Sequence, residues 1–415
     1  MLEPETSNLR HLRAFLAVQD LGSSLAASRA VHVSQPAVTQ AIAKLETTLG
    51  VSLFVRHSAG MVVTEAGAVF GRRVRRALTH IRHGTLAVVA TGGQARTVAR
   101  DGFDKLVTAA QLRALISVSD SGNFSLAARS IGISQPSLHR LARDLERLSG
   151  VVMYERKAHG IALSEGAAEM ARLARLAFGE LRQAGEELDH LKGIRRSRMH
   201  IGALPLVRTG ILPRVINAHC QAYPQTRIRV VDGPYDALLR DLRHGTIDIL
   251  VGALREPAPI DDIVQTALFS DRLSIVARRG HPLGRKRRIT VADLAAYPWI
   301  APSPGAPARA QFDKVFAGGH DAFRDGLVEA SSLVVVRGLL LESDRLTLLS
   351  PHQVEPELRL GMLEIVPFEL GDVPRRIGMT VRADWQPTPM QAAFVVELTA
   401  GCAVAAGGVA APAGR

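Results

Sequence analysis

The sequence predicts a multidomain protein in which two all-α-rich winged helix-turn-helix units precede a larger α/β domain. Two observations support this fold class. The segment 12–70 realigns without gaps with the segment 112–170, at an offset of 100 residues. From Arg198 onward, short apolar strands alternate with helices, as they do in α/β sheets with crossover connections. With 415 residues, 47% of them hydrophobic, the chain has the apolar material for several packed cores.

The composition favours a polyanion-binding protein and disfavours several other classes. Lys and Arg number 51 against 39 Asp and Glu, and a net charge of +12 attracts nucleic acid at low salt, although it also fits a solvated surface. Cys220 and Cys402 have no neighbouring Cys or His cluster, so we expect neither a disulfide framework nor a metal site. The N-terminus lacks the pattern of a secretory signal, and Arg337 interrupts the best apolar run, so we expect a soluble cytoplasmic protein.

Each repeat is predicted to form three helices, and the second repeat illustrates the pattern. An apolar face at 112–118 marks its first helix, small residues at 125–130 mark its second, and Gly132 supplies the turn. Ser134 can cap the third helix, whose first turn tolerates Pro136. Along the third helix two leucines at helical spacing, Leu138 and Leu145, are expected to face inward and to leave outward the polar side chains Gln135, Ser137, His139 and Arg140.

A two-stranded wing is predicted after the third helix of each repeat. In the second repeat, the apolar runs 151–154 and 161–163 flank Arg156 and Lys157, and the first repeat has the same plan around Arg56. A short helix, a tight turn and a helix with a polar outward face form the architecture that fits a DNA major groove. Basic residues on the wing would then contact phosphates.

Two stretches outside the repeats carry apolar residues at helical spacing. Residues 167–193 show the alternating three- and four-residue spacing of a coiled-coil seam, and we expect a dimerisation linker helix there. Residues 71–106 carry a weaker seam that runs into Gly92-Gly93, which predicts a helical connector and a flexible joint. Packing against a neighbouring unit is the alternative for both stretches, and for residues 71–106 we favour it. The seam within 167–193 consists of Leu173, Ala177, Leu181, Ala184, Leu188 and Leu191.

The repeats resemble the DNA-binding segment of LysR-type transcriptional regulators. The family's Gly-Ser-Phe opening, Ser-Gln-Pro triplet, Leu-Glu pair and wing Arg are matched by GSSLAASRAVHVSQPAVTQAIAKLETTLGVSLFVR and by GNFSLAARSIGISQPSLHRLARDLERLSGVVMYER. The resemblance implies winged helix-turn-helix units at 8–70 and 107–166, where the usual member of the family has one such unit. It also implies a sequence-specific regulator of transcription that is neither an enzyme nor dependent on a cofactor.

By this resemblance, the third helix and the wing of each unit contact double-stranded DNA. Ser24 replaces an aromatic residue that the second unit keeps as Phe124, so the first unit is expected to be less stable. Gln40 replaces the Arg that the second unit keeps as Arg140, so the two units are expected to read different half-sites. The implied DNA-contacting residues are Gln35, Pro36, Thr39, Gln40 and Arg56 in the first unit, and Gln135, Pro136, Ser137, His139, Arg140 and Arg156 in the second.

Residues 197–400 resemble the LysR effector-binding domain, a two-lobed α/β fold like that of periplasmic binding proteins. The similarity rests on IGALPLVRTGILPRVI, GTIDILVG and ARRGHPLG, and the GALPL opening resembles regulators of sugar-binding-protein genes. A sugar or sugar acid is therefore the first expectation for the effector. The family also implies a homodimer or homotetramer, with RNA polymerase as a partner if the protein is an activator. The implied effector-binding residues are Leu204, Pro205, Leu206, Val207, Gly233, Ser303, Ser331 and Ser332.

The C-terminal tail and three alternative functions remain to be considered. The Ala/Gly-rich tail 401–415 lacks aromatic anchors and is expected to be disordered. One helix-turn-helix unit serving only packing or dimerisation is an alternative, and so is a sensor that acts through protein contacts alone. An enzyme is disfavoured, because the chain contains no G-x-S-x-G, phosphate-loop or H-E-x-x-H motif.

Overall fold

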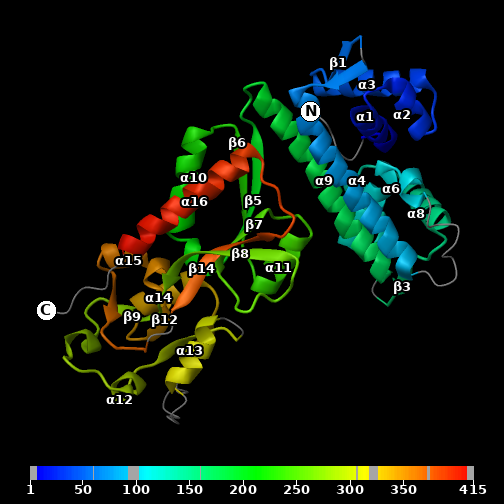
Figure 1. The fold of residues 1–415 in the computed structure, drawn as a ribbon. Coiled ribbons are helices and arrows are strands. Elements are labelled where there is room, and N and C mark those ends of the chain that lie inside the picture. The colour runs from blue at the N-terminus through cyan, green and yellow to red at the C-terminus, as the bar shows by residue number, and fades with distance from the viewer. Residues whose placement is uncertain are drawn as a thin grey trace. The chain divides into compact units, whose positions relative to one another are not determined.

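The computed structural model describes residues 7–58, 60–91, 102–158, 160–304, 307–316, 326–371 and 374–408. The chain divides into two compact units, Met1–Arg196 and Ser197–Arg415, and each is considered by itself (Figure 1). Within the described ranges, no helix is both long enough and apolar enough to cross a membrane.

The first helix-turn-helix forms the start of the N-terminal unit. The side chains of Asn8, Ser23 and Ser34 each accept a hydrogen bond from a backbone N–H in the first turn of the helix that follows, which explains where the three helices begin. Gly50 ends the third helix in the left-handed conformation. The elements are α1 (Leu9–Leu21), α2 (Ser24–Ala30), α3 (Gln35–Leu49), β1 (Phe54–His57) and β2 (Gly60–Val63).

The second helix-turn-helix repeats this plan and confirms the predicted caps. Ser134 Oγ accepts a hydrogen bond from the Ser137 N–H, and Leu138 and Leu145 are fully buried. The wing begins at Tyr154 rather than at Val151. The Glu146 carboxylate of α8 accepts hydrogen bonds from the Met153 and Tyr154 N–H groups and so holds this stretch of backbone against the helix. The elements are α5 (Phe103–Leu106), α6 (Ala109–Ser121), α7 (Phe124–Ser130), α8 (Gln135–Ser149), β3 (Tyr154–Lys157) and β4 (Gly160–Leu163).

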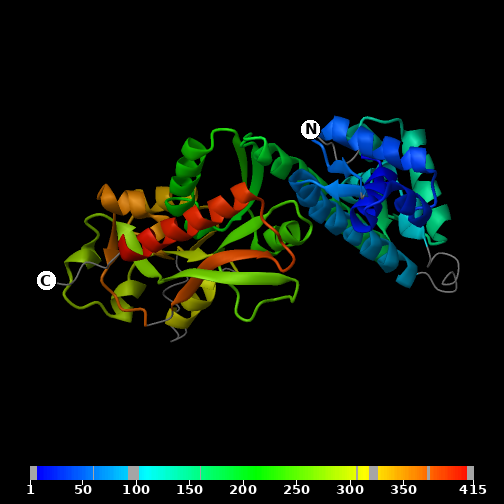
Figure 2. The same ribbon diagram turned by 45° about the horizontal axis from the view of Figure 1, so that its top comes forward.

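Two long helices, α4 (Glu65–Thr91) and α9 (Glu165–Leu191), follow the two wings and pack against each other (Figures 1 and 2). They run antiparallel, since Arg73 near the start of α4 bonds to Glu187 near the end of α9. At the opposite end, a Cβ atom placed on Gly84 would lie 3.2 Å from the Cα atom of Met170. Such a close approach leaves little room for a side chain at residue 84.

This packing corrects the expectation of a dimer seam along the second long helix. The seam residues Leu181 and Leu188 are buried within the chain, in one hydrophobic core with Val74 and Ile81 of α4. The seam spacing was identified correctly, but its partner is a helix of the same chain, as the alternative interpretation had it. The predicted joint at Gly92-Gly93 lies outside the described residues.

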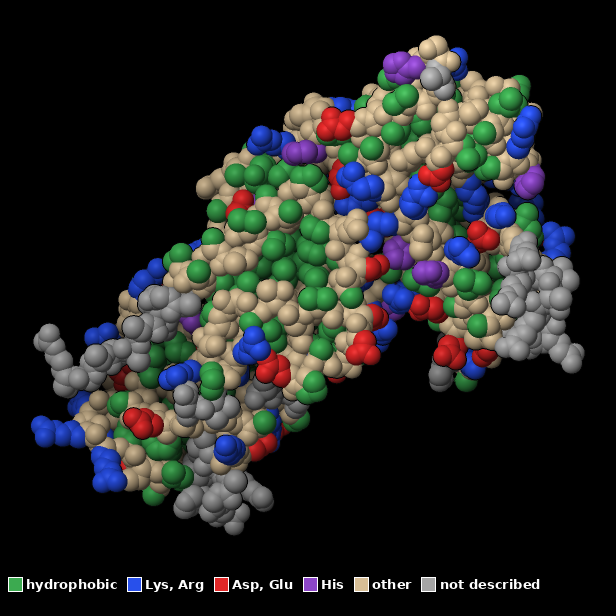
Figure 3. Space-filling model, viewed as in Figure 1, with side chains coloured by type: hydrophobic (Ala, Val, Ile, Leu, Met, Phe, Trp, Pro, Cys, Tyr) green, Lys and Arg blue, Asp and Glu red, His purple; other side chains and the backbone are tan. Residues whose placement is uncertain are grey.

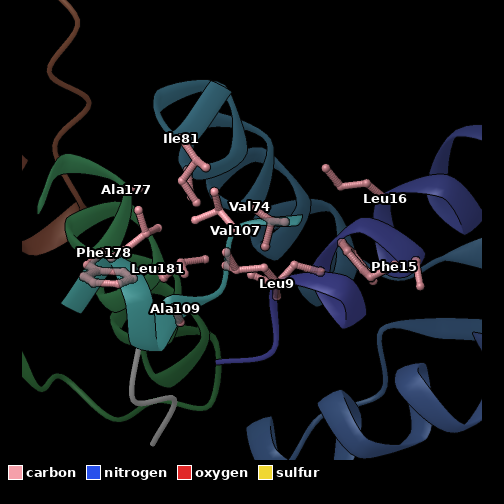
Figure 4. Packing of buried hydrophobic residues seen from close by; sticks show 14 of the residues in the cluster. Leu9, Phe15, Leu16, Val74, Ile81, Val107, Ala109, Ala177, Phe178 and Leu181 are labelled. Atoms are coloured by element: carbon pink, nitrogen blue, oxygen red, sulfur yellow. The ribbon is translucent and has the colours of Figure 1, made fainter. Parts of the chain in front are cut away.

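Both helix-turn-helix units contribute to this core. Figure 4 shows Leu9 of α1 and Ala109 of α6 directed into the space between α4 and α9, beside Val74 and Phe178. Hydrogen bonds also join the two units, since the guanidinium group of Arg13 in α1 donates to the carbonyl oxygens of Asp104 and Lys105 in α5. Unit Met1–Arg196 is therefore one packed body that holds two helix-turn-helix units.

The C-terminal unit contains two five-stranded sheets, which confirms the two-lobed α/β architecture. The first sheet has the order β6-β5-β7-β14-β8, with β5 pairing in parallel with β6 and β7. Alternate residues of β7 face opposite sides: Val251 packs with α10 and α16, whereas Leu250 packs with α11. The elements are β5 (Ser197–Ala203), α10 (Ile211–Ala222), β6 (Thr226–Val231), α11 (Tyr235–Arg243), β7 (Ile249–Ala253), β8 (Ile263–Asp271), β14 (Arg375–Arg382) and α16 (Pro389–Gly408).

The second sheet has the order β11-β10-β12-β9-β13, and helices also cover both of its faces. Ile275 of β9 faces the core that includes Trp299, and the adjacent Val276 faces the core that includes Leu340. The elements are β9 (Ser274–Arg278), α12 (Val291–Ala295), β10 (Trp299–Pro302), α13 (Pro307–Phe316), β11 (Val328–Ala330), α14 (Leu333–Leu341), β12 (Leu346–Leu349), α15 (Glu355–Arg359) and β13 (Leu363–Val366), with short 3-10 helices at Pro205–Val207, Pro282–Arg285 and Pro351–Gln353.

The expectation of a disordered tail from residue 401 was wrong for residues 401–408. They continue α16, because alanines favour a helix and because Cys402 and Ala405 are buried in the core of the first lobe. Residues 409–415 lie outside the described range. The outward side of α16 carries the exposed Val396 and Val404, and Figure 3 shows apolar side chains gathered over this helix.

Candidate nucleic-acid interface and ligand region

The predicted contact residues of the first unit lie at the exposed start of α3. Gln35 and Pro36 occupy its first turn, and the Gln35 amide donates a 3.1 Å hydrogen bond to the hydroxyl of Ser24 in α2. Thr39 donates its hydroxyl to the Gln35 carbonyl at 3.2 Å, and Gln40 is exposed. This face offers amide and hydroxyl groups and no charge.

The equivalent face of α8 is more ordered and more basic. Gln135 accepts a 2.8 Å hydrogen bond from Ser125, one position beyond the residue that corresponds to Ser24 of the first unit. The imidazole of His139 stacks on Phe124, with ring centroids 4.2 Å apart. Arg140 is exposed beside it, and the Ser137 hydroxyl accepts a hydrogen bond from Ser134. A guanidinium group and an oriented imidazole therefore replace the neutral pair of the first unit.

The wing arginines lie at matching places in the two hairpins. Arg56 pairs in register with Met61, and Arg156 pairs with Ile161. Both arginines are exposed, which leaves their guanidinium groups accessible to a phosphate.

Sequence reasoning missed two further cations on the third helices. Lys44 and Arg143 are exposed one turn beyond Gln40 and Arg140. Helical spacing of three and four residues could have identified them, because side chains at that spacing share one helix face. Both are suited to contact a phosphate rather than a base, since they lie farther from the start of the helix.

The residues predicted to bind an effector separate into two groups in the first lobe. Leu204 and Gly233 follow the carboxyl ends of the parallel strands β5 and β6, at one edge of the sheet. Pro205 is exposed there, whereas Leu206 and Val207 are buried in the core of the lobe. The two buried side chains therefore position the loop, and the sheet edge is left as the surface that can meet a ligand.

The predicted serines of the second lobe also share one sheet edge. Ser303 follows β10 and Ser331 follows β11, and these parallel strands pair through Pro302 and Ala330. Ser332 is the N-cap of α14, and it is exposed. The exposed serine hydroxyls and the first turn of α14 supply hydrogen-bond donors at this edge.

Two groups that sequence reasoning missed lie at the ligand edge of the first lobe. Tyr235 begins α11 two residues after Gly233, and the Arg255 guanidinium lies 4.7 Å from the centre of its ring. Burial raises the pKa of Tyr235, with opposing and supporting contributions from the charges of Arg255 and Asp236. No sequence motif links an arginine and a tyrosine 20 positions apart; the parallel order of β6 and β7 around β5 brings them together.

Polar contacts join the two lobes behind these edges. The Thr209 hydroxyl donates to the His352 carbonyl at 3.0 Å, and Arg214 forms a 2.9 Å ion pair with Glu355. Burial lowers the pKa of His352, and the negative charges of Asp271 and Glu355 only partly oppose this effect. The arrangement of the lobes seen here therefore disfavours protonation of His352. In the described residues, no cluster of His, Cys, Asp and Glu has the geometry to hold a metal ion.

Family models match almost the whole chain. Residues 9–68 and 109–168 each match the bacterial regulatory helix-turn-helix protein, lysR family, and residues 192–403 match the LysR substrate binding domain. The duplication predicted from the sequence repeat is thus confirmed by two separate matches to one model.

The relatives found differ in how much of this chain they match. The HTH-type transcriptional regulator GalR of Pseudomonas putida is 32% identical over 395 residues, which span 95% of this chain and 97% of that protein. The uncovered 5% is shorter than either helix-turn-helix match, so the likeness extends into both units. The HTH-type transcriptional regulator PcaQ of Agrobacterium fabrum is 29% identical and spans 69% of this chain and 92% of its own. A full-length OxyR variant from Pseudomonas aeruginosa, 20% identical with a TM-score of 0.52, shares the fold over 70% of this chain and 93% of its own.

Proposed function

The chain belongs to the LysR family of DNA-binding transcriptional regulators, and we propose that both of its helix-turn-helix units read DNA, each through its own third helix and wing. The observation that carries this proposal is that both units present a polar third-helix face and a wing arginine to solvent. A unit kept only for packing would have no need of either feature. The proposed base-reading residues are Gln35, Pro36, Thr39 and Gln40 in the first unit and Gln135, Pro136, Ser137, His139 and Arg140 in the second, with Arg56 and Arg156 on phosphates.

Replacing Arg140 and Arg156 by Ala tests this proposal, because base and phosphate contacts respond differently to salt. Arg140→Ala is expected to weaken binding by about 1–3 kcal/mol on the specific site and to affect unrelated duplexes little, as loss of a bidentate base contact does. Arg156→Ala is expected to weaken all duplexes alike and to reduce the salt slope by about 1. Gel-shift titrations on DNA flanking the protein's own gene, at several salt concentrations, measure both effects.

The control is Arg147→Ala, which removes an exposed arginine from the last turn of α8, where it pairs with Asp144. Its effect on specific binding should be small. If Arg140→Ala and Arg156→Ala both bind like the wild type, the second unit does not read DNA, and the structural role of that unit or regulation through protein contacts replaces the proposal.

We propose a sugar or sugar acid as the small-molecule effector, held between the ligand edges of the two lobes. The family binds its effectors in this domain, and the serines 303, 331 and 332 together with Leu204 and Gly233 border the region. Arg255 favours the acid, since in the described part of the chain it forms no ion pair and stacks on Tyr235. An effector carboxylate could pair with a guanidinium group placed in this way.

Calorimetric titration of the protein with gluconate and with glucose tests the effector proposal. Gluconate is expected to bind more tightly, and Arg255→Ala is expected to remove about 1.5–3 kcal/mol of its binding free energy while leaving glucose unchanged. Arg229→Ala, which removes an exposed arginine from β6, is the control. Equal binding of both compounds to wild type and Arg255→Ala would reject the carboxylate contact, and binding of neither would reject this effector class.

The proposed mechanism couples the two lobes to the DNA-binding unit. LysR regulators form oligomers and respond to effectors, and here we propose a homodimer or homotetramer built through the C-terminal domains. An effector that binds one arrangement of the lobes more tightly shifts the population toward that arrangement. The ion pair of Arg214 with Glu355 and the bond from Thr209 to His352 are the contacts that such a shift would change. RNA polymerase is the proposed partner where the protein activates transcription.

A further inference from the structure

A buried ion cluster occupies one end of the contact between α4 and α9. The Arg73 guanidinium donates to Glu187 at 3.0 Å, to Glu180 at 2.8 Å and to the amide oxygen of Gln183 at 2.8 Å. Arg76 donates to Glu180 at 2.8 Å from the next turn of α4. The Arg73 side chain is only 4% exposed, so these bonds form away from water.

Electrostatics hold this cluster in its charged form. Burial by itself lowers the pKa of Arg73, but its hydrogen bonds and charge interactions with Glu187 and Glu180 outweigh burial and raise the pKa above its ordinary value. A buried guanidinium group that loses its carboxylates would be left with an uncompensated charge, as would the carboxylates without the guanidinium group.

The two long helices follow the two repeats at equivalent places, yet they contribute different residues to the cluster. At the repeat offset, Arg73 and Arg76 correspond to Leu173 and Leu176 of α9. Conversely, Glu180, Gln183 and Glu187 of α9 correspond to His80, His83 and Ala87 of α4. All the arginines of the cluster thus come from α4, and all its carboxylates come from α9.

This division decides which helices can pair. Two antiparallel copies of α4 would place Arg73 against His80, His83 and Ala87, with no carboxylate to receive it. Two copies of α9 would bury Glu180 and Glu187 against Leu173 and Leu176. Either arrangement buries unpaired charge, which is strongly unfavourable, whereas the pair of α4 with α9 satisfies both partners.

The other end of the contact is asymmetric as well. A Cβ atom on Gly166 would lie 2.5 Å from the Thr91 hydroxyl and 2.8 Å from the Ala87 carbonyl oxygen, so only glycine permits this approach of α9 to α4. The corresponding residue of the first repeat is Ala66. The close packing is therefore also specific to α4 with α9.

We propose that α4 and α9 pair selectively with each other within one chain. Each chain then has a complete N-terminal unit, here called the head, which holds two different DNA readers in a fixed order. The readers are the third helices α3 and α8 with their wings, and that part of the inference rests on the proposed function. An operator for one chain would accordingly contain two unlike half-sites. A second chain is not needed to complete the head.

A disulfide across α4 and α9 tests the pairing in the full-length chain. Residues 84 and 170 suit it, because the Cβ position of residue 84 lies 3.2 Å from the Cα atom of Met170, so the two positions meet directly across the helix contact. In a Cys220→Ser/Cys402→Ser background, Gly84→Cys/Met170→Cys is expected to oxidise within one chain and to remain monomeric on a non-reducing denaturing gel. Intact mass should fall by the two hydrogen atoms lost.

The matched control probes pairing between two copies of α9. By the repeat, residue 184 corresponds to Gly84, so Met170→Cys/Ala184→Cys would form covalent dimers if two α9 helices met antiparallel. We expect no such dimer. Covalent dimers from either cysteine pair, or no disulfide from the pair at 84 and 170, would overturn the proposal.

DNA binding by the oxidised protein distinguishes a failure of the helix pairing from a failure of the proposed DNA-reading function. The disulfide-locked chain is expected to bind operator DNA within about twofold of the reduced chain, because locking leaves the active arrangement in place. If only the reduced chain binds, the active head pairs its helices differently and the inference fails. If neither form binds although the disulfide forms within the chain, the pairing stands and the proposed DNA-reading function fails.

Discussion

Arg73→Met is expected to lower the free energy of unfolding of the N-terminal unit by about 3–5 kcal/mol, the range for breaking a buried ion pair by removing one partner. The reason is that Glu180 and Glu187, 6% and 8% exposed, would both lose the buried Arg73 guanidinium, although Glu180 would keep its bond to Arg76. Both tryptophans, Trp299 and Trp385, lie in the C-terminal unit, so their fluorescence reports that unit alone. Denaturant unfolding of the full chain should therefore shift in circular dichroism and leave the tryptophan transition in place.

Two variants make this expectation specific to the buried charge. Arg73→Met/Glu180→Gln/Glu187→Met removes the buried charges and leaves only the partly exposed Arg76 of the cluster, so it should recover most of the loss. Arg75→Met removes an arginine of the same helix whose pair with Asp20 is exposed, and its effect should stay below about 1 kcal/mol. Equal effects of Arg73→Met and Arg75→Met would show that the buried cluster contributes no more than a surface ion pair.

Local chemistry made the helix-turn-helix units predictable from sequence. Ser134, Pro136 and Gly150 determine where α8 begins and ends, and these signals act over a few residues. The apolar spacing of α9 likewise predicted a seam. It could not identify the helix that packs against the seam, because an apolar stripe does not specify which apolar surface will cover it. Arg73 has the opposite difficulty: an arginine in a helix usually indicates a solvated face, and only the structure shows the carboxylates that it meets.

The ligand region was predictable to a smaller extent. Sequence resemblance located the strand ends at Leu204, Gly233 and Ser303, and the structure puts them at the carboxyl edges of their sheets. Arg255 and Tyr235 were missed, because their contact depends on strand order rather than on spacing along the chain. The helical continuation of α16 was missed because an Ala/Gly-rich run has a disordered composition until an apolar surface, here the core around Cys402, receives it.

Selective pairing of the long helices has a consequence for evolution of the two readers. In a symmetric dimer, every substitution in a reader changes both half-sites at once. Within one chain, Gln40 and Arg140 can diverge separately while the core between α4 and α9 keeps both readers in one body. The uncharged start of α3 and the basic, stacked start of α8 are the outcome expected of that freedom.

Paired substitutions in the two readers should therefore remove different parts of one extended footprint. Gln35→Ala/Gln40→Ala deletes the amides of the first reader, and Gln135→Ala/Arg140→Ala deletes an amide and a guanidinium group of the second. The second pair is expected to cost more, about 2–5 kcal/mol in operator affinity against about 1–2 kcal/mol for the first, because charged contacts are stronger than neutral ones.

Nuclease footprinting of the purified protein on the DNA flanking its gene measures both the position and the size of each loss. Thr47→Ala/Thr48→Ala is the control, since these threonines lie in the last turn of α3 and donate their hydroxyls to the carbonyls of Ala43 and Lys44. If only the second pair of substitutions alters protection, the first unit serves to complete the packed head and α8 alone selects the operator. If each pair erases its own segment, the order of the two half-sites on the DNA follows from the order of the two readers in the chain.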